Sequence, residues 1–267
     1  MGSYFSKSSD DKDPIFVSLG MAACLFRTDT LGARMTDTAA AHPKKVGCCV
    51  LAGSDFPDSV EQAIVSWGIA LTIKRDPSRL STRGLLKYSG DSFKGSQDAH
   101  LRAVNLVDVY SPNHLEFLAT FGSGDGHRPS TEFDCAMIEE LVAQVLKSGV
   151  GRDGGGAAVI RCAEHGCVVA ARSYSIQWFP AFHSSSRVLD ATGAGNAFLG
   201  AFAVTLSTTS DLTEAAIAGS VAASFVVEQV GMPRRTSSSH GEEQWNGEAF
   251  SARIDRFRTM METAAKG

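Results

Sequence analysis

The sequence has no apolar stretch close to the roughly 20 residues that a membrane-spanning helix needs, and no apolar core of a secretory signal. It also has no long basic run. The 25 Lys and Arg residues are outnumbered by 29 Asp and Glu residues, which gives a net charge of −4. Nucleic-acid-binding surfaces normally carry excess positive charge. We therefore expect neither a membrane nor a nucleic-acid partner, and favour a small molecule or a protein.

Cysteine is scarce and carries no recognisable pattern. The 267 residues include six cysteines, with no Cys-x-x-Cys pair and no cysteine–histidine spacing typical of zinc sites. This pattern is typical of reduced thiols in a cytoplasmic protein, which is the location we expect. The cysteines are Cys24, Cys48, Cys49, Cys135, Cys162 and Cys167.

The first 13 residues are polar and are expected to form a disordered tail, followed by one α/β domain over 14–267. The start, MGSYFS, also fits the pattern for acylation at Gly2, with Ser6 in its last place. That pattern fixes only two positions, so we favour the tail. A single acyl chain would give only marginal membrane binding.

Segments with strand-like patterns alternate with segments that have helical patterns, which predicts a mostly parallel sheet with helices on both faces. Ligands of such folds bind at the carboxyl ends of the strands. Strands are expected at 14–20, 44–53, 69–75, 82–88, 105–113, 157–162, 167–172 and 174–182, and helices at 56–68, 114–122, 131–149, 212–231 and 248–266.

Two further expectations concern the start of one helix and the connection before the last one. Thr131 is expected to be the N-cap of the helix at 131–149. Residues 89–103 are polar and weakly patterned, and 234–247 are rich in serine and glycine, so the latter are expected to form a flexible loop.

The stretch RVLDATGAGNAFLGAFAV (187–204) is predicted to be a strand end at Val188 and Leu189, a glycine turn and a helix. Backbone amides of Gly193, Ala194 and Gly195 at a helix N-terminus suit an anion. The alternative is a helix start where small residues allow close packing. A Rossmann fingerprint is excluded because Phe198 stands where its third glycine would be, and no Walker A sequence occurs.

Asp190, Asn113 and Glu116 each allow two interpretations. Asp190 can form a turn with its own backbone, or orient the amides of the glycine turn. Asn113 and Glu116 lie three residues apart at a strand-to-helix junction. They can form a capping box, which the spacing alone favours, or they can hold a water-rich Mg²⁺ beside phosphates.

Four segments together resemble the pfkB/ribokinase-like carbohydrate kinases. DATGAGNAFLGAFA (190–203) resembles the family signature D-T-x-G-A-G-D, and NHLE (113–116) is similar to its N-x-x-E magnesium motif. AAVIRCAEHGCVV (157–169) looks like the hairpin that borders the nucleotide phosphates, and 215–233 looks like the adenine-side helix. The order also matches, and the resemblance is strongest to a fungal maintenance-of-killer-like branch.

This resemblance implies a three-layer, Rossmann-like (ribokinase-like) α/β fold that uses ATP and Mg²⁺ to phosphorylate a sugar-like alcohol. The amides at 193–195 would stabilise the transferred phosphoryl group, and position 196 would take the acceptor's proton. Asn113 and Glu116 would hold Mg²⁺. The predicted nucleotide-binding residues are Asp190, Arg161, Ala163 and Gly166.

The sequence departs from the family pattern in ways that weaken the implied activity. Asn196 replaces the aspartate, and a neutral amide is no general base. No Gly-Gly occurs between Gly20 and Val46, where the family has its substrate-binding Gly-Gly motif, and the lid is reduced or missing between Tyr88 and Leu106. Arg161, Ala163 and Glu164 stand where Thr, Gly and Ser are common. We expect a shortened substrate half (14–105), a nucleotide half (106–267), and either weak kinase activity or a non-catalytic nucleotide-binding scaffold.

Overall fold

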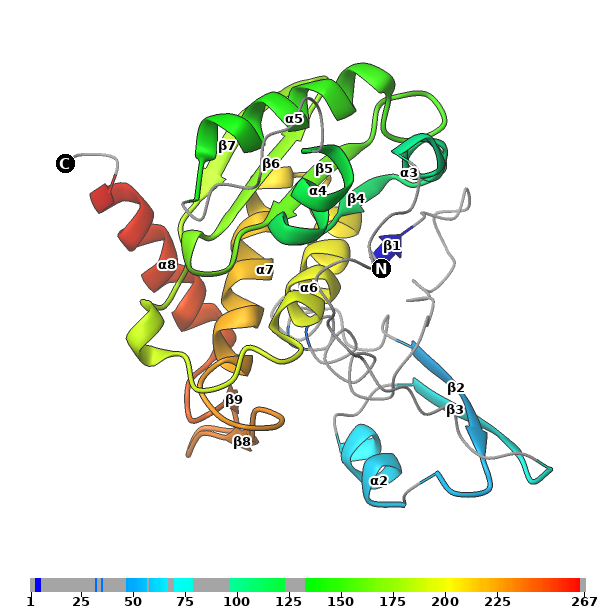
Figure 1. Ribbon diagram of the computed structural model, residues 1–267. Coiled ribbons are helices and arrows are strands. Elements are labelled where there is room, and N and C mark those ends of the chain that lie inside the picture. The colour runs from blue at the N-terminus through cyan, green and yellow to red at the C-terminus, as the bar shows by residue number, and fades with distance from the viewer. Residues whose placement is uncertain are drawn as a thin grey trace. The chain divides into compact units, whose positions relative to one another are not determined.

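The structure is a computed structural model, and it describes residues 3–5, 32, 35, 47–56, 58–66, 70–78, 97–122 and 133–264 (Figure 1). The chain forms two compact units. The first consists of Met1–Lys7 and Leu86–Ala181, and the second of Ser8–Leu85 and Phe182–Gly267. The strands expected at 14–20 and 82–88, and the lid region before residue 97, lie outside the described residues.

The first unit contains a five-stranded sheet in the order β1-β4-β5-β6-β7. Strands β4 and β5 are parallel, because helices lie between them in the chain, whereas short turns make β5–β6 and β6–β7 antiparallel. Four of these strands confirm expected strands. The bounds are Ser3–Phe5 (β1), Val109–Ser111 (β4), Ala157–Arg161 (β5), Cys167–Ala171 (β6) and Tyr174–Phe179 (β7).

Strand β1 lies within the segment 1–13, where the sequence predicts a tail. It pairs antiparallel with β4, with Tyr4 opposite Tyr110. The rest of that segment lies outside the described residues, so the tail and the acylation of Gly2 stay predictions.

Helices α3 (Gln97–Val104), α4 (His114–Phe121) and α5 (Cys135–Ser148) lie on one face of this sheet (Figure 1). Phe117 and Ile138 from the helices pack with Ile160 and Val168 from the strands, and all four are fully buried. The weakly patterned segment 89–103 did not predict α3. Burial of one helix face, rather than helix propensity, stabilises such an element.

Helix α5 begins later than the sequence predicts. Its N-cap is Asp134, whose Oδ1 accepts a hydrogen bond from Met137 N at 3.1 Å. The prediction of Thr131 as N-cap is therefore wrong. Asp134 takes that position instead, and its side-chain oxygen satisfies an otherwise unpaired amide at the start of the helix.

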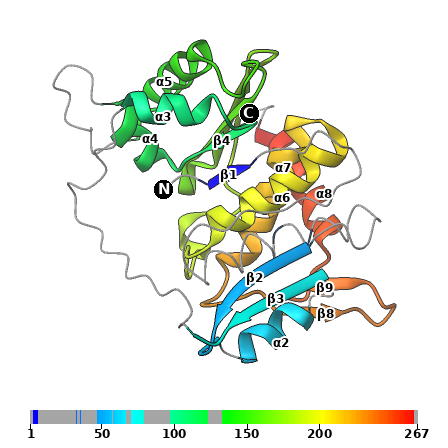
Figure 2. The same ribbon diagram turned by 90° about the vertical axis from the view of Figure 1, so that its right-hand side faces the viewer.

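In the second unit, strands β2 (Gly47–Gly53) and β3 (Ala70–Asp76) pair in parallel, and α2 (Asp58–Ser66) connects them and lies beside them (Figure 2). All three elements confirm expected ones. Arg75 on β3 forms ion pairs with Asp58 and Glu61 on α2. This β-strand–helix–β-strand unit is a crossover connection, which two consecutive parallel strands require.

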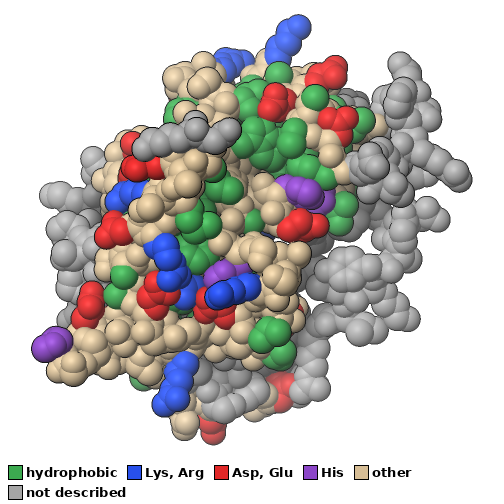
Figure 3. Space-filling view, turned by 90° about the vertical axis from the view of Figure 1, so that its left-hand side faces the viewer, with side chains coloured by type: hydrophobic (Ala, Val, Ile, Leu, Met, Phe, Trp, Pro, Cys, Tyr) green, Lys and Arg blue, Asp and Glu red, His purple; other side chains and the backbone are tan. Residues whose placement is uncertain are grey.

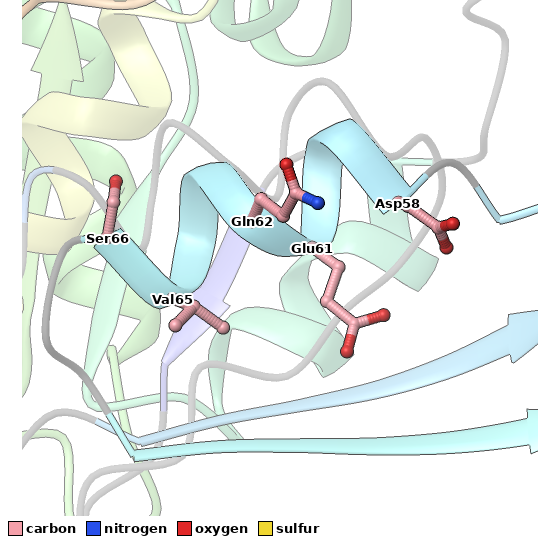
Figure 4. A pocket seen from close by; sticks show the side chains of 5 residues that line it. All are labelled: Asp58, Glu61, Gln62, Val65 and Ser66. Carbon is pink, nitrogen blue, oxygen red and sulfur yellow. The ribbon is translucent and has the colours of Figure 1, made fainter.

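An open surface pocket of about 460 Å³ lies along α2 and is lined by Asp58, Glu61, Gln62, Val65 and Ser66. In Figure 4 these side chains spread along the helix and do not converge on one point. A ligand site needs convergent polar groups. We therefore assign no function to this pocket.

Helices α6 (Ala194–Thr209) and α7 (Leu212–Val226) pack side by side, as Figures 1 and 2 both show. Small residues allow the close contact: a Cβ on Gly219 would lie 2.9 Å from the Phe198 ring. Asp211 caps α7 by accepting a hydrogen bond from Thr213 N at 2.7 Å. Both helices confirm the sequence prediction, as does α8 (Phe250–Ala264).

Residues 234–247 form a hairpin of β8 (Arg235–Ser237) and β9 (Glu243–Trp245), so the prediction of a flexible loop is wrong. Trp245 is 1% exposed and fixes the hairpin to the rest of the unit. Arg235 and Glu243 also form an ion pair across the two strands. The serine and glycine content of this segment indicates a turn, but it does not indicate that Trp245 is buried.

A charged cluster surrounds Arg253 of α8, which is only 4% exposed. Its guanidinium lies 2.7 Å from Glu228 Oε1 and 2.8 Å from Glu248 Oε2, and 3.6 Å above the Phe225 ring. Asn246 Nδ2 donates to Glu228 Oε2 at 2.8 Å. The name Arg253 cluster stands for Arg253, Glu228, Glu248, Phe225, Asn246 and His183.

Glu228 should make the stability of the protein depend on acid pH. Partial burial alone would raise its pKa, but hydrogen bonds from Asn246, Arg253 and His183 and the positive charge of Arg253 together lower the pKa below its usual range. Stabilisation by the carboxylate is complete above the unfolded-state pKa and is lost as pH falls through the folded-state pKa. When urea unfolding is measured from about pH 7 to about pH 3, the free energy of unfolding should fall more steeply for wild type than for Glu228→Gln. Equal slopes would contradict this assignment.

Within the described ranges, no helix is both long and apolar enough to cross a membrane. On the face drawn in Figure 3, basic and acidic side chains of the described residues are interspersed. Neither kind gathers into a patch there, which agrees with the balanced composition.

Candidate functional site

The glycine turn at 190–195 has the geometry of a helix N-terminus entered through left-handed backbone. Gly193 is the N-cap of α6 with a φ of 86°. Ala194 N donates to Ala191 O at 3.2 Å, and Asn196 N donates to Gly193 O at 3.1 Å. Glycine suits this position because its φ value is unfavourable for residues with a side chain.

In the part of the chain that the structure describes, the amides of Gly193 and Gly195 make no hydrogen bond. The first amides of a helix have no partner within the helix, and the helix dipole places partial positive charge there. The turn can therefore bind an anion through two backbone N–H groups.

Close packing, the alternative explanation for the small residues here, also holds in part. A Cβ on Gly32 would lie 2.0 Å from Ala197 O, so Gly32 lies against the first turn of α6. Ala197 is fully buried. Small residues thus serve packing on this side of the turn, while the residues at 193–196 keep partial exposure.

The strand end predicted at Val188 and Leu189 is wrong. A short 3-10 helix, η2 (Ser185–Arg187), precedes these residues, and Leu189 is 72% exposed. Leu189 N donates to Val227 O at 2.8 Å, beyond the end of α7. The segment has this carbonyl rather than a neighbouring strand as its partner, so no β-ladder forms.

Asp190 forms the turn with its own backbone that the sequence allows. Its Oδ1 accepts a hydrogen bond from Thr192 N at 2.9 Å. Hydrogen bonds from the Thr192 side chain and backbone lower the pKa of Asp190. Its carboxylate therefore shapes the entry to the glycine turn, and its assignment to nucleotide binding stays a prediction.

In the first unit, Asn113 and Glu116 form the predicted capping box. Glu116 N donates to Asn113 Oδ1 at 2.8 Å, and Asn113 N donates to Glu116 Oε2 at 3.0 Å. The described residues hold no group of three metal-binding Asp, Glu, His or Cys side chains. The structural interpretation of this pair is thus confirmed, and the magnesium role stays a prediction.

Replacing Asn113 with alanine should lower the free energy of unfolding by about 0.5–2 kcal/mol, because the Glu116 amide loses the side-chain oxygen that it donates to. Asn113→Asp keeps an acceptor at the N-cap and should lose much less. Urea unfolding of the three proteins measures the difference. Equal stability of wild type and Asn113→Ala would show that the box contributes nothing.

The hairpin between β5 and β6 turns through a 3-10 helix, η1 (Ala163–His165), and Gly166. Ala163 has a φ of 51° and Gly166 a φ of 85°. Positive φ at position 163 explains why glycine is common there in the family that the sequence resembles, and alanine accepts the strain.

Arg161 at the end of β5 connects the hairpin to the N-x-x-E segment. It forms an isolated parallel bridge with Asn113, and its Nη2 donates to Ser111 O at 2.8 Å. The structure thus brings together the first unit's predicted site residues Asn113, Glu116, Arg161, Ala163 and Gly166. Asp190, Gly193, Ala194, Gly195 and Asn196 lie together in the second unit.

Gly166→Ala should destabilise the hairpin strongly, since a Cβ there would lie 1.9 Å from Phe179 O. Gly241→Ala is the matched control, because Gly241 has a φ of 83° and nothing within 4 Å of the added atom. We expect the control to lose about 1–2 kcal/mol from φ strain alone, and Gly166→Ala to lose about 1–3 kcal/mol more. Chemical denaturation compares them, and equal losses would refute the clash.

No sequence pattern indicates the aromatic cluster that joins the two motifs of the first unit. The Phe133 ring stacks on His165 of the hairpin turn at 3.7 Å and meets His114 of α4 edge-on at 5.6 Å. Trp178 packs against the same ring, and its Nε1 donates to Glu139 at 2.7 Å. These residues are far apart in sequence, so no local pattern shows their contact.

The three described cysteines on or near the hairpin differ in their exposure. Cys162 and Cys167 are buried, whereas Cys135 is exposed. Burial, followed by the neighbouring Cys167 and Cys135, raises the pKa of Cys162 to about 12, so it stays a neutral thiol. A neutral buried thiol is inert, and we give Cys162 no chemical role.

Two fungal proteins are similar to this chain. An uncharacterized protein of Schizosaccharomyces pombe is 31% identical over 170 residues, which cover 58% of this chain and 45% of that protein. Protein MAK32 of Saccharomyces cerevisiae is 25% identical over 305 residues, covering 84% of this chain and 81% of MAK32. The chain thus matches less than half of the S. pombe protein.

Solved structures show the same fold. The ribokinase of Giardia lamblia aligns with a TM-score of 0.55 and 17% identity, covering 77% of this chain and 83% of that one. A putative ribokinase II of E. coli, in complex with ATP and Mg²⁺, aligns with a TM-score of 0.55 and 14% identity over 95% of each chain. The expected three-layer, ribokinase-like α/β fold is confirmed. The expectation of a mostly parallel sheet does not hold for the described five-stranded sheet, in which only β4 and β5 pair in parallel.

A family model decides the assignment. The model of the pfkB family of carbohydrate kinases matches residues 29–236, which include the glycine turn, the capping box and the β5–β6 hairpin. The chain therefore belongs to the pfkB family of carbohydrate kinases.

Proposed function

We propose that the protein binds Mg-ATP and transfers its γ-phosphoryl group, slowly, to a sugar-like alcohol. The observation that carries this proposal is the pair of unbonded amides, Gly193 and Gly195, at the N-terminus of α6. Phosphoryl transfer depends mainly on positioning and on stabilising negative charge. Backbone N–H groups at a helix start supply such stabilisation without reorganisation.

Asn113 and Glu116 are the residues that would hold Mg²⁺ through its waters. Amide and carboxylate oxygens are the ligand types that Mg²⁺ takes. Each oxygen of the capping box accepts a backbone hydrogen bond, and such oxygens have more than one lone pair, so the box and a hydrated Mg²⁺ are compatible. When bound, Mg²⁺ would neutralise phosphate charge, while the capping box keeps both side chains in place.

The predicted nucleotide contacts from the hairpin are Arg161, Ala163 and Gly166, with Asp190 shaping the turn. Arg161 would add a positive charge beside the phosphates, which partly offsets the exposed Glu164 on the same turn. Asn196 would orient the acceptor hydroxyl through its amide but cannot take the proton. The expected result is weak turnover.

The alternative is a non-catalytic nucleotide-binding protein that acts through a protein partner. Asn196 at the base position favours this alternative, because it removes the general base and leaves the anion site intact. Both versions need Mg-ATP binding, and only the first needs turnover. A cytoplasmic location, expected from the reduced thiols, belongs to the same proposal.

Thermal unfolding with and without Mg-ATP tests the shared part of the proposal. A ligand at 100 times its Kd adds about 2.7 kcal/mol to the free energy of unfolding, so a clear rise in Tm is expected. Mg²⁺ alone and ATP with a chelator are the controls. No rise at millimolar Mg-ATP would refute nucleotide binding.

A further inference from the structure

The segment 183–190, which leads into the glycine turn, is held at both ends by two consecutive residues after α7. At its start, His183 Nε2 lies 2.9 Å from Glu228 Oε1. At its end, Leu189 N and Asp190 N both donate to Val227 O, at 2.8 and 3.4 Å. Residues 184–189 between these points are all exposed, so little packing holds them.

Glu228 is itself fixed from two other elements. Arg253 of α8 lies 2.7 Å from Oε1, and Asn246, after β9, donates to Oε2 at 2.8 Å. Arg253 is buried and stacks on Phe225. The carboxylate is thus a rigid anchor, whereas the His183 side chain, 9% exposed, is the part of the loop that reaches it.

We propose that His183 and Glu228 are positioning residues for the glycine turn. We assign neither residue a catalytic role. Glu228 holds His183, and His183 holds the start of the loop that ends in Asp190 and Gly193. Without this contact the loop would keep its bonds to Val227 O and the short-range bonds within 184–188, but its start would lose its link to Glu228, and the turn amides would lose their fixed direction. The inference rests on the proposed nucleotide site at that turn.

The test compares wild type, His183→Ala, His183→Gln and the control His240→Ala. Glutamine can donate one hydrogen bond to Glu228, so His183→Gln should restore wild-type behaviour. His240 lies in the exposed turn between β8 and β9. Two measurements are made on each full-length protein: hydrogen exchange of peptides covering 184–196, and calorimetric affinity for Mg-ATP.

In His183→Ala we expect exchange over 184–196 to accelerate by about tenfold or more, since a hydrogen bond to a charged group is lost. Exchange in α7 and α8 should stay near wild type, and the Kd for Mg-ATP should rise about tenfold. Unchanged exchange over 184–196 would overturn the proposal. Acceleration spread over α7 and α8 would also overturn it, because it would show a merely structural role.

The exchange measurement needs no nucleotide, which separates this inference from the proposed function. If wild type binds no Mg-ATP, the proposed function fails, and the exchange result alone decides whether His183 positions the turn. If wild type binds Mg-ATP and His183→Ala binds it equally well, the positioning role is refuted.

Discussion

Replacing Asn196 with aspartate should raise ATP turnover by about 10²–10⁴-fold, the usual contribution of a general base. Asn196 is the third residue of α6, and its backbone N donates to Gly193 O at 3.1 Å. A carboxylate at this position can take the proton from the hydroxyl group that is phosphorylated, whereas an amide cannot take it. The change is also compatible with the fold, because acidic side chains are favourable in the first turn of a helix.

Asn196→Ala is the matched control and should leave turnover near the wild-type level. ADP formation with a panel of monosaccharides and nucleosides as acceptors measures the rates, and a thermal scan checks that all three proteins are equally folded. If Asn196→Asp binds Mg-ATP but turns over no faster than wild type, proton removal is not the main defect. The missing Gly-Gly segment would then be the limiting feature.

Replacing Arg253 with leucine should lower the free energy of unfolding by about 3–5 kcal/mol, a large share of the roughly 5–15 kcal/mol by which folded proteins are ordinarily stable. Arg253 is 4% exposed and pairs with Glu228 and Glu248, which are 24% and 25% exposed. Leucine would leave both carboxylates half-buried without their main cation. It would also remove the cation–π contact with Phe225, 3.6 Å away.

Arg256→Leu is the control for this experiment. Arg256 also contacts Glu248, at 3.1 Å, but is 51% exposed, and an exposed ion pair contributes about 1 kcal/mol or less. Urea unfolding of both variants at neutral pH gives the two losses. A loss for Arg253→Leu as small as that for Arg256→Leu would show that α8 packs through its apolar residues alone.

Local sequence patterns predicted most of the elements around the candidate site. Helices α6 and α7 and the β5–β6 hairpin follow from periodicity, small residues and a short turn, which act over a few positions. The predictions at Val188–Leu189 and 234–247 were wrong because distant contacts decide these segments. A carbonyl at Val227 holds Leu189, and a buried Trp245 turns a serine-rich segment into a hairpin.

The site itself could be predicted as residue types but not as geometry. The spacing of Asn113 and Glu116 allowed two roles, and only the hydrogen bonds show the capping box. Phe133 reaches His165 across 32 positions, and Arg253 reaches Glu228 across 25. Neither contact leaves a periodic or spaced signal, so the residues that fix the hairpin and the glycine-turn loop were missed.

The central claim is that the glycine turn at the start of α6 binds the phosphates of Mg-ATP. Gly195→Asp tests it directly, because a carboxylate at the second residue of α6 suits the helix but repels phosphate. Gly195→Ala controls for added volume. Calorimetric titration with Mg-ATP should show saturable binding to wild type and at least about tenfold weaker binding to Gly195→Asp, with Tm unchanged. Equal affinity in wild type and Gly195→Asp, or no binding to wild type, would contradict the claim.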